Sequence, residues 1–328
     1  MIIVTGGAGF IGSNIIAALE EQGRTDIVVA DSLGTDEKWK NIAKRELRAI
    51  IPPEELLDFI RNHVSEIDAI IHMGAISATT EKDADLIVRT NLTLTQKLWK
   101  FCADYQKQFI YASSAATYGD GTLGFSDDSD LAHLKNLRPL NAYGWSKSLV
   151  DVWSARNQAE GLAQPCQCAG LKFFNVYGPN EYHKGGQKSV VAHIYPNVSR
   201  NETVQLFKSY NPHYADGWQL RDFVWVGDCV NVVLWLLNHP EISGLFNVGS
   251  GEARSFYDLA KATFNALDLP EKIAFKDMPA ELQGKYQYYT KADLSNLRAM
   301  GYTAPMTQLE EGVGTYVKNY LSQEDIYR

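Results

Sequence analysis

The sequence predicts an α/β fold of the Rossmann type, a doubly wound parallel sheet with a smaller C-terminal substrate lobe. Short β-branched runs alternate with helix-forming segments of ten or more residues through the first half of the chain. A glycine-rich turn follows the first of these runs. After residue 175 the sequence changes to irregular segments rich in Gly, Pro, His and aromatic residues. This order is typical of a sheet covered by helices on both faces and followed by a second lobe.

The first unit is a strand, a glycine turn and a helix. Met1–Val4 predicts the strand, and Ser13–Gln22 predicts a helix rich in Ala, Ile and Leu. Gly6 allows the tight turn, Gly9 lets the backbone approach a pyrophosphate, and Gly12 lets the helix pack closely on the strand. The phosphates would meet the positive end of the helix.

The second predicted strand, Asp26–Ala30, runs directly into Asp31. In dinucleotide-binding units an acid about 20 residues beyond the glycines binds the adenosine ribose. Asp31 occupies that place. A three-glycine pattern alone is a weak signal, but with this acid it predicts dinucleotide binding.

The later elements continue the alternation. Strands are predicted at Ala69–His72, Gln108–Tyr111 and Gly170–Phe174, and helices at about 54–62, 86–105 and 143–158. Ligands of such sheets bind beyond the carboxyl ends of the strands. We expect a Rossmann domain over residues 1–175 with returning segments at about 221–250, and a substrate-binding lobe formed by 176–220 and 251–328.

Composition excludes several classes of protein. The chain has 328 residues and a net charge of −8, with no long run of Lys or Arg, so binding to nucleic acid or to a membrane surface is not expected. The longest apolar runs, such as Val232–Leu237, are too short to span a bilayer. We expect a cytoplasmic protein without a signal peptide.

The four cysteines do not have the spacing of a metal or redox site. Cys166 and Cys168 are too close for a CxxC pair, and Cys102 and Cys229 stand alone. We expect buried, reduced thiols and no metal site.

A catalytic group is predicted around Tyr143. Tyr143 and Lys147 are four residues apart and share one face of the predicted helix. A phenol titrates near pH 10, and a neighbouring ammonium together with a nicotinamide's positive charge would favour its ionised form. Tyr143 could then act as a general base, while Ser114 at the end of a strand hydrogen-bonds the reacting oxygen.

A second YxxxK pair needs separate treatment. Tyr257 and Lys261 have the same spacing, and about one such pair is expected by chance in a chain with this many tyrosines. This pair has no preceding strand that carries a serine. We interpret it as structural and assign catalysis to the first pair.

These residues resemble the extended short-chain dehydrogenase/reductase superfamily, which includes nucleotide-sugar epimerases and dehydratases. The resemblance implies that a tightly held nicotinamide cofactor oxidises a sugar carbinol and that Ser114, Tyr143 and Lys147 are catalytic. The 4,6-dehydratases of this superfamily carry an acidic pair after the serine. Ala115 and Ala116 stand there in this chain, so the resemblance implies epimerisation.

Further motifs are similar to those of the ADP-glyceromanno-heptose 6-epimerase family, over nearly the whole chain. They are Ile76–Glu81, Tyr111–Gly119, Phe174–Pro179, His183–Gly185, Arg221–Val224, Gly284–Gln287 and Ala292–Tyr302. The resemblance implies inversion at C-6″ of ADP-D-glycero-β-D-manno-heptose, a small-molecule substrate, to the L-glycero epimer of lipopolysaccharide cores. It also implies a homo-oligomer.

That reaction would pass through a transient ketone, because the hydrogen on carbon 6 is not acidic. The ketone would turn in the site and take hydride back on its other face, which calls for two bases. Tyr143 would be one, and the resemblance implies Lys184 as the other. Two alternatives stay open: a C-4 epimerase of another nucleotide sugar, and a non-catalytic dinucleotide-sensing protein of the same fold.

The resemblance also implies the ligand-binding residues. Those for the cofactor are Gly6, Gly9, Phe10, Ile11, Gly12, Asp31, Ser32, Lys38, Met73, Gly74, Ala75, Ile76, Ser77, Thr90, Asn91, Lys147, Val176 and Lys184. Those for the substrate are Asn175, Gly186, His193, Phe207, Lys208, Ser209, Arg221 and Tyr286. Arg221 would clamp the ADP pyrophosphate in a bidentate manner.

The identity of the cofactor is open between two forms. Asp31 favours NAD, because an acid there repels a 2′-phosphate. The resembling family uses NADP with an aspartate at this point, and Lys38 or Lys40 could bind the phosphate. We expect NADP, with NAD as the alternative.

The chain departs from the family pattern at several places. Gly186 stands where the family usually has a serine, Met73 replaces an acidic residue and Thr90 an asparagine. A second cofactor lysine has no counterpart near Pro52 and Pro53. The loop from Tyr210 to Leu220 is longer than the pattern, which could alter the mouth of the substrate site.

Overall fold

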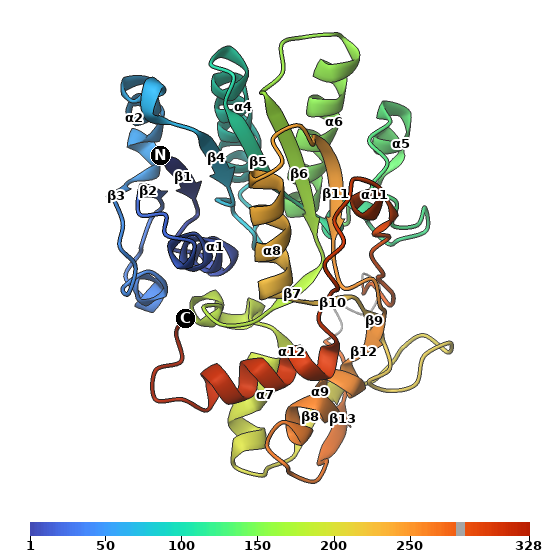
Figure 1. The fold of residues 1–328 in the computed structure, drawn as a ribbon. Coiled ribbons are helices and arrows are strands. Elements are labelled where there is room, and N and C mark those ends of the chain that lie inside the picture. The colour runs from blue at the N-terminus through green and yellow to red at the C-terminus, as the bar shows by residue number, and fades with distance from the viewer. Residues whose placement is uncertain (280–285) are drawn as a thin grey trace.

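The central sheet contains seven parallel strands (Figure 1). This structure is a computed structural model that describes residues 1–279 and 286–328; Gly284 and Lys285 of the motif quoted above lie outside the described residues. The sheet order is β11 (Gly244–Val248), β6 (Gln167–Phe173), β5 (Gln108–Ser114), β4 (Ala69–His72), β1 (Ile2–Thr5), β2 (Ile27–Ala30) and β3 (Ala49–Ile51).

Strand β1 lies where the winding direction reverses, because it pairs with β2 on one side and β4 on the other. Ile3 is in register with Val28 of β2 and with Ile70 of β4. After β1 the sheet grows in one direction, through β2 and β3, and from β4 it grows in the other, through β5 and β6. The connections that follow β1 and β4 therefore diverge, which opens a crevice at the carboxyl ends of these two strands. The predicted doubly wound parallel sheet is confirmed.

Two helical layers cover the sheet because its strands are apolar on both faces. On β1, Ile2 and Val4 belong to one buried cluster, while Ile3 between them belongs to another. The first cluster lies against α1 (Phe10–Glu21) and α8 (Val226–Leu237). Against the second lie α2 (Leu56–Asn62), α4 (Leu94–Asp104), α5 (Leu131–Asn136) and α6 (Ala142–Ala159).

The smaller part of the molecule lies below the sheet in Figure 1 and consists of strand pairs and helices. The pairs are β7 (Asn175–Tyr177) with β10 (Phe223–Trp225), β9 (Leu220–Arg221) with β12 (Arg254–Ser255), and β8 (Val204–Phe207) with β13 (Ile273–Lys276). The helices are α7 (Val190–Ser199), α9 (Phe256–Asn265) and α12 (Leu309–Tyr316). They enclose buried clusters of their own.

One late segment packs on the sheet rather than among these helices. Helix α11 (Ser295–Ala299) contacts β11, and Asn296 Nδ2 donates to the Leu245 carbonyl at 2.9 Å. Leu297 is buried in the same cluster as α1 and α8. The predicted boundaries placed this segment, as part of 251–328, in the smaller lobe. The division of the chain into two domains at those boundaries stays a prediction.

Local differences from the predicted elements have simple causes. Strand β3 was not predicted, because it has three residues and one of them, Ile50, is exposed. The helix predicted at 86–105 consists of α3 (Ala84–Ile87), a π-helical segment at Val88–Thr93 and then α4. Cys166 is exposed and Cys168 is only partly buried, so the expectation of four buried thiols was wrong for these two residues.

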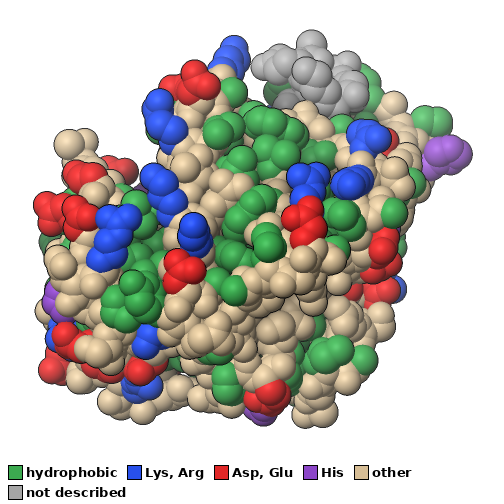
Figure 2. Space-filling model, turned by 90° about the horizontal axis from the view of Figure 1, so that it is seen from above, with side chains coloured by type: hydrophobic (Ala, Val, Ile, Leu, Met, Phe, Trp, Pro, Cys, Tyr) green, Lys and Arg blue, Asp and Glu red, His purple; other side chains and the backbone are tan. Residues whose placement is uncertain are grey.

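Charges of both signs are interspersed on the molecular surface. Figure 2 shows Lys and Arg side chains beside Asp and Glu side chains across the face seen from above, with hydrophobic side chains between them. Within residues 1–279 and 286–328, no helix combines the length and apolarity needed to cross a membrane.

Candidate active site

The glycine turn after β1 forms a cradle at the crevice. Gly6 has φ +63°, and a Cβ there would lie 2.6 Å from Gly74 Cα in the loop after β4. A Cβ on Gly12 would lie 2.3 Å from the Gly6 carbonyl oxygen, so α1 packs closely on the turn. Within the described residues, no side chain caps the start of α1 at Gly9, which leaves the N–H groups of its first turn for a phosphate. The cradle fits the pyrophosphate of a dinucleotide.

Asp31 lies at the end of β2 beside this cradle. Its Oδ2 accepts a hydrogen bond from Ala8 N at 3.0 Å, and its Oδ1 accepts one from Lys38 Nζ at 2.7 Å. Lys38 also donates to the Ser32 carbonyl at 2.8 Å. Lys40 instead forms an ion pair with Glu37. An acid and a cation are thus paired at the position expected for the adenosine ribose.

A cavity of about 550 Å³ extends from this cradle along the carboxyl ends of β1, β4 and β5. Most of the predicted cofactor residues line it: Gly6, Gly9, Phe10, Ile11, Gly12, Asp31, Lys38, Met73, Gly74, Ala75, Ser77, Lys147, Val176 and Lys184. Four do not line it: Ser32, Ile76, Thr90 and Asn91. Asn91 is fully buried and supports the wall, because it exchanges hydrogen bonds with the Ile76 backbone and donates to Ser146 Oγ of α6.

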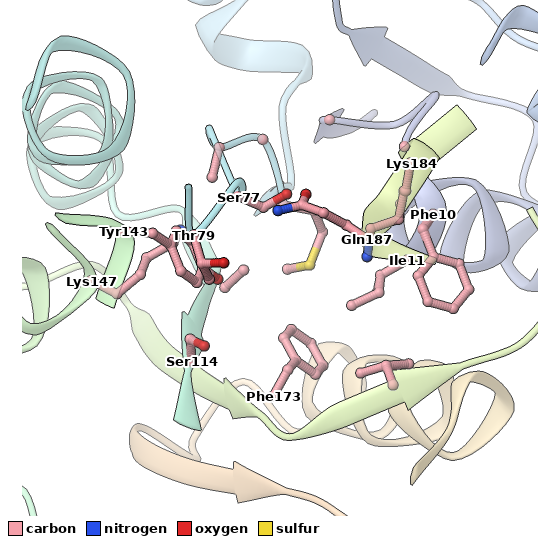
Figure 3. Close-up of a pocket in the computed structure, with 18 of the residues that line it drawn as sticks. Phe10, Ile11, Ser77, Thr79, Ser114, Tyr143, Lys147, Phe173, Lys184 and Gln187 are labelled. Carbon is pink, nitrogen blue, oxygen red and sulfur yellow. The ribbon is translucent and has the colours of Figure 1, made fainter. Parts of the chain in front are cut away.

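Ser114, Tyr143 and Lys147 lie together on one side of the cavity (Figure 3). Ser114 ends β5, and its Oγ accepts a hydrogen bond from Ala116 N at 3.1 Å. Asn141 caps α6 by accepting from Gly144 N at 2.8 Å, which fixes the helix start just before Tyr143. Lys147 follows one turn later. The structure therefore brings the predicted catalytic group together.

The titration of this group differs from the expectation. Burial raises the pKa of Tyr143, and hydrogen bonding with Ser114 acts in the opposite direction. Burial lowers the pKa of Lys147 to about 8, while the Asp151 carboxylate opposes this shift. We expected the ammonium to favour the phenolate, but in the protein alone the low-polarity surroundings disfavour both charged forms.

Lys184 lies on the other side of the cavity, close to Phe10 and Ile11 (Figure 3). It belongs to the 3₁₀ turn Tyr182–Gln187, and its Nζ is 5.3 Å from the centre of the Phe10 ring. Burial lowers the pKa of Lys184, and Glu181 opposes this effect. A lowered pKa makes a lysine available as a base.

A second cavity, of about 750 Å³, adjoins the first at Gly186, which lines both. The predicted substrate residues His193, Phe207 and Tyr286 line it. Four others do not: Asn175 is exposed, Lys208 forms a surface ion pair with Asp277, Ser209 Oγ donates to the Asn211 carbonyl, and Arg221 lies near two of the lining rings without lining the cavity itself.

Arg221 lies beside the second cavity as a buried cation. Its guanidinium is 5.1 Å from the ring of Tyr286 and 5.8 Å from that of Phe256, and both rings line the cavity. Burial lowers its pKa, and among the described residues no carboxylate forms an ion pair with it. A buried guanidinium of this kind is suited to an anionic ligand.

The second YxxxK pair lies on the surface, outside both cavities. Tyr257 OH donates to Glu271 Oε2 at 3.0 Å, and Lys261 Nζ is 3.1 Å from Glu271 Oε1. Both side chains thus serve a surface contact of α9.

Several lining residues were not predicted. They are Thr79, Ala112, Ser113, Phe173, Phe174, His183 and Gln187. All of them except Phe173 and Gln187 lie within motifs quoted above, which was a usable signal. Gln187 points into the cavity in Figure 3, and nothing in the sequence around it indicates this.

The fold and this sheet-edge site define a class of dinucleotide-binding enzymes. The model of the family described as "NAD dependent epimerase/dehydratase family" matches residues 2–249, and the chain belongs to that family.

Comparison with individual relatives shows which members of this family the chain resembles in sequence and fold. ADP-L-glycero-D-manno-heptose-6-epimerase of Fusobacterium nucleatum subsp. nucleatum is 49% identical over 335 residues, with 100% of both chains covered. The crystal structure of the Helicobacter pylori enzyme of that name is 26% identical, with a TM-score of 0.78, and the match covers 97% of this chain and 95% of that one. The UDP-glucose 4-epimerase of Thermus thermophilus, solved as a complex with NAD, has 25% identity, a TM-score of 0.75 and coverages of 96% and 97%. The predicted resemblance is confirmed, and within the family this chain belongs with the ADP-L-glycero-D-manno-heptose-6-epimerases.

Proposed function

We propose that this protein inverts C-6″ of ADP-D-glycero-β-D-manno-heptose to give ADP-L-glycero-β-D-manno-heptose. One observation carries the proposal: Ser114, Tyr143 and Lys147 share a cavity with a glycine cradle that fits a dinucleotide pyrophosphate. The identity of 49% to a relative named for this epimerisation supports the choice of substrate.

The chemistry follows from the carbon that is inverted. Its hydrogen is not next to a carbonyl group in the substrate, so a side chain cannot remove it as a proton. A nicotinamide dinucleotide held at the cradle of Gly6, Gly9 and Gly12 would supply the hydride acceptor for this carbon and the hydride donor for the return. The substrate is a planar ketone in between, and return to its other face gives the epimer.

The side chains manage the proton of the hydroxyl group. Tyr143 accepts it as general base, and Ser114 hydrogen-bonds the same oxygen as its charge changes. Lys147 lies one helical turn from Tyr143, and its ammonium form would favour the ionised phenol. The ketone presents its oxygen in two orientations, and Lys184, on the side of the cavity opposite Tyr143, serves the second (Figure 3).

The nucleotide of the substrate occupies the second cavity in this proposal. The buried Arg221 faces no carboxylate among the described residues and can bind the pyrophosphate through two parallel hydrogen bonds. Gly186 lines both cavities, so the sugar can reach Tyr143 while ADP stays in the second.

We further propose that the cofactor is NADP. The Asp31 carboxylate is paired with Lys38 at 2.7 Å, so its charge is compensated where a 2′-phosphate would lie. Lys38→Met should weaken NADP binding about tenfold and leave NAD binding unchanged, as measured by calorimetry. Lys40→Met is the matched control, because Lys40 pairs with Glu37 and does not line the cavity. Equal loss of NAD and NADP binding in Lys38→Met would argue against the 2′-phosphate contact.

The test of the epimerase proposal is proton NMR of the purified protein with ADP-D-glycero-D-manno-heptose and no added cofactor. We expect a mixture of two epimers from the natural protein and from Tyr257→Phe, and no conversion by Tyr143→Phe. The two variants lose the same hydroxyl from the same motif, but only Tyr143 lines the cavity. The proposal fails if no conversion occurs even after NADP and NAD are added, and turnover of UDP-hexoses instead would indicate a C-4 epimerase.

A further inference from the structure

A buried ion pair lies behind Ser114, and the chemistry described above does not use it. Lys172 Nζ of β6 is 2.8 Å from Asp151 Oδ2 of α6, and the two side chains are 0% and 1% exposed. Removing two charges from water is unfavourable, and a buried pair is often no more stabilising than apolar side chains of the same size. Its contacts indicate what it does here.

Asp151 binds α6 to the strand that carries Ser114. It lies one turn beyond Lys147 and two turns beyond Tyr143, on the same helix face. Its Oδ2 accepts a hydrogen bond from Ser113 Oγ at 2.7 Å, and its Oδ1 accepts one from Tyr111 OH at 3.1 Å. The residue immediately before Ser114 is therefore held to the helix that bears the catalytic base.

Lys172 holds the other side of Ser114. It lies opposite Ser113 in the β5–β6 register and donates to Thr117 Oγ1 at 2.8 Å. Thr117 in turn donates to the Ser114 carbonyl at 2.8 Å. The Lys172 ammonium also lies 4.8 Å from the centre of the Tyr118 ring. Hydrogen bonds thus connect the ion pair to Ser114 from both sides, through Ser113 to Asp151 and through Thr117 to Lys172.

We propose that Asp151 and Lys172 are a positioning pair, which fixes Ser114 against the face of α6 that carries Tyr143 and Lys147. The inference rests on the proposed role of Ser114 and adds to it the two residues that set its place. A reacting oxygen can be shared between a serine and a tyrosine only if both hydroxyl groups are held within hydrogen-bond reach of it.

The pair also shapes the charge around the catalytic group. The titratable and charged side chains near Lys147 are Tyr143 and Asp151 of α6, Tyr111 of β5, Lys172 of β6 and the buried His72 of β4, whose pKa burial lowers to about 3. The Asp151 carboxylate raises the pKa of both Tyr143 and Lys147. Asp151→Asn should therefore move the pH profile of kcat/KM to lower pH. Lys172→Met leaves the carboxylate uncompensated and should move it to higher pH.

The test is a double-mutant cycle between Lys172→Met and Ser114→Ala. Lys172→Met should lower kcat about tenfold or more with KM within about twofold, and Lys172→Arg should restore most of it. Once Ser114 is replaced, Lys172→Met should lower kcat by less than about twofold further, because it acts through Ser114. If Lys172→Met does not fold, Thr117→Val carries the same cycle, since it removes the hydroxyl that accepts from Lys172 Nζ and donates to the Ser114 carbonyl, while both charges of the ion pair stay in place.

The matched control is Asp228→Asn. Asp228 is a buried carboxylate held by Thr307 at 2.8 and 2.9 Å, outside both cavities. The Asp228→Asn substitution should lower Tm while leaving kcat and the pH profile of kcat/KM unchanged. The proposal would be overturned if the losses of kcat in Lys172→Met and Ser114→Ala were additive. It would also be overturned if neither Asp151→Asn nor Lys172→Met moved the pH profile of kcat/KM.

Crystal structures of the variants test the positioning role without any substrate. The distance between Ser114 Oγ and the Tyr143 phenol should change in Lys172→Met and stay the same in Asp228→Asn. An unchanged distance in Lys172→Met overturns the inference even if the protein is an active epimerase. Absence of heptose turnover by the natural protein refutes the proposed function instead.

Discussion

Lys147 is an ammonium group that the fold buries at 2% exposure, and burial lowers its pKa to about 8. The unfolded chain keeps that proton up to about pH 10.4, so between the two values it binds more protons than the native state does. The resulting destabilisation is fully present below pH 8 and disappears as the pH rises towards 10.4. A side chain placed for catalysis thus lowers the stability of the fold.

Replacing Lys147 by Met removes this buried charge. Without the buried charge, the free energy of unfolding at pH 7 should be higher than that of the natural protein by up to about 3 kcal/mol. The variant should therefore unfold at a higher temperature, and it should have lost turnover. Calorimetry at pH 7 and near pH 10 checks it, because the advantage over the natural protein should shrink at the higher pH. A variant that is less stable at pH 7 would contradict the account.

The site residues that could be predicted from the sequence are those that belong to a local pattern. Tyr143 and Lys147 are one helical turn apart, and Ser114 ends a predicted strand, so spacing alone suggested that they meet. Asp151 and Lys172 could not be found in this way, because their significance depends on contacts with Ser113 and Thr117 across two strands and a helix. No local pattern marks such contacts.

Among the elements, α6 determines the geometry of the site through its close approach to the 3₁₀ turn Ala115–Tyr118. A Cβ on Gly144 would lie 2.6 Å from the Ala116 carbonyl oxygen. Gly144→Ala should therefore push α6 away from Ser114 and lower kcat about tenfold.

Gly314→Ala is the control for Gly144→Ala. Gly314 also lies inside a helix, α12, but a Cβ there meets nothing within 4 Å. This substitution should stabilise the protein by roughly 0.5–1 kcal/mol and leave kcat unchanged. Steady-state kinetics with thermal unfolding would distinguish the two, and equal kinetics in both variants would show that the helix position is not critical.

The strength of the sequence signal for each element depended on its length and burial. Strands β1, β2 and β4 are buried at every position and stand out as apolar runs. The turn that carries Lys184 gave no such signal, because its conformation depends on Gly185 at φ +53° and on contacts of Glu181 with Ser189. Its place in the site rested on the family resemblance.

For the whole molecule, the structure separates a cofactor cavity at the sheet from a second cavity in the smaller part, and the two adjoin at Gly186. In the proposed function, ADP of the substrate occupies the second cavity. Arg221→Met should therefore raise the KM for the substrate and the Kd for ADP about tenfold or more, with cofactor binding unchanged. Calorimetric titration with ADP and NADP checks this, and parallel losses for both ligands would contradict the separation.

The arrangement of the chain as a whole was predictable only in outline. Alternating strands and helices predicted the doubly wound sheet, because each element must bury an apolar face against its neighbours. The return of segment 292–302 to β11 and α8 could not be predicted, since it depends on single contacts such as Asn296 with the Leu245 carbonyl.

In the proposed reaction, a hydrogen that is not acidic leaves carbon 6 as hydride and returns to the same carbon within one site. The most direct test of this mechanism uses ADP-D-glycero-D-manno-heptose with deuterium at C-6″, incubated in ordinary water, with both epimers analysed by NMR and mass spectrometry. We expect the epimeric product to keep deuterium at C-6″. Replacement of that deuterium by solvent hydrogen would show that it leaves as a proton, and would contradict the hydride mechanism.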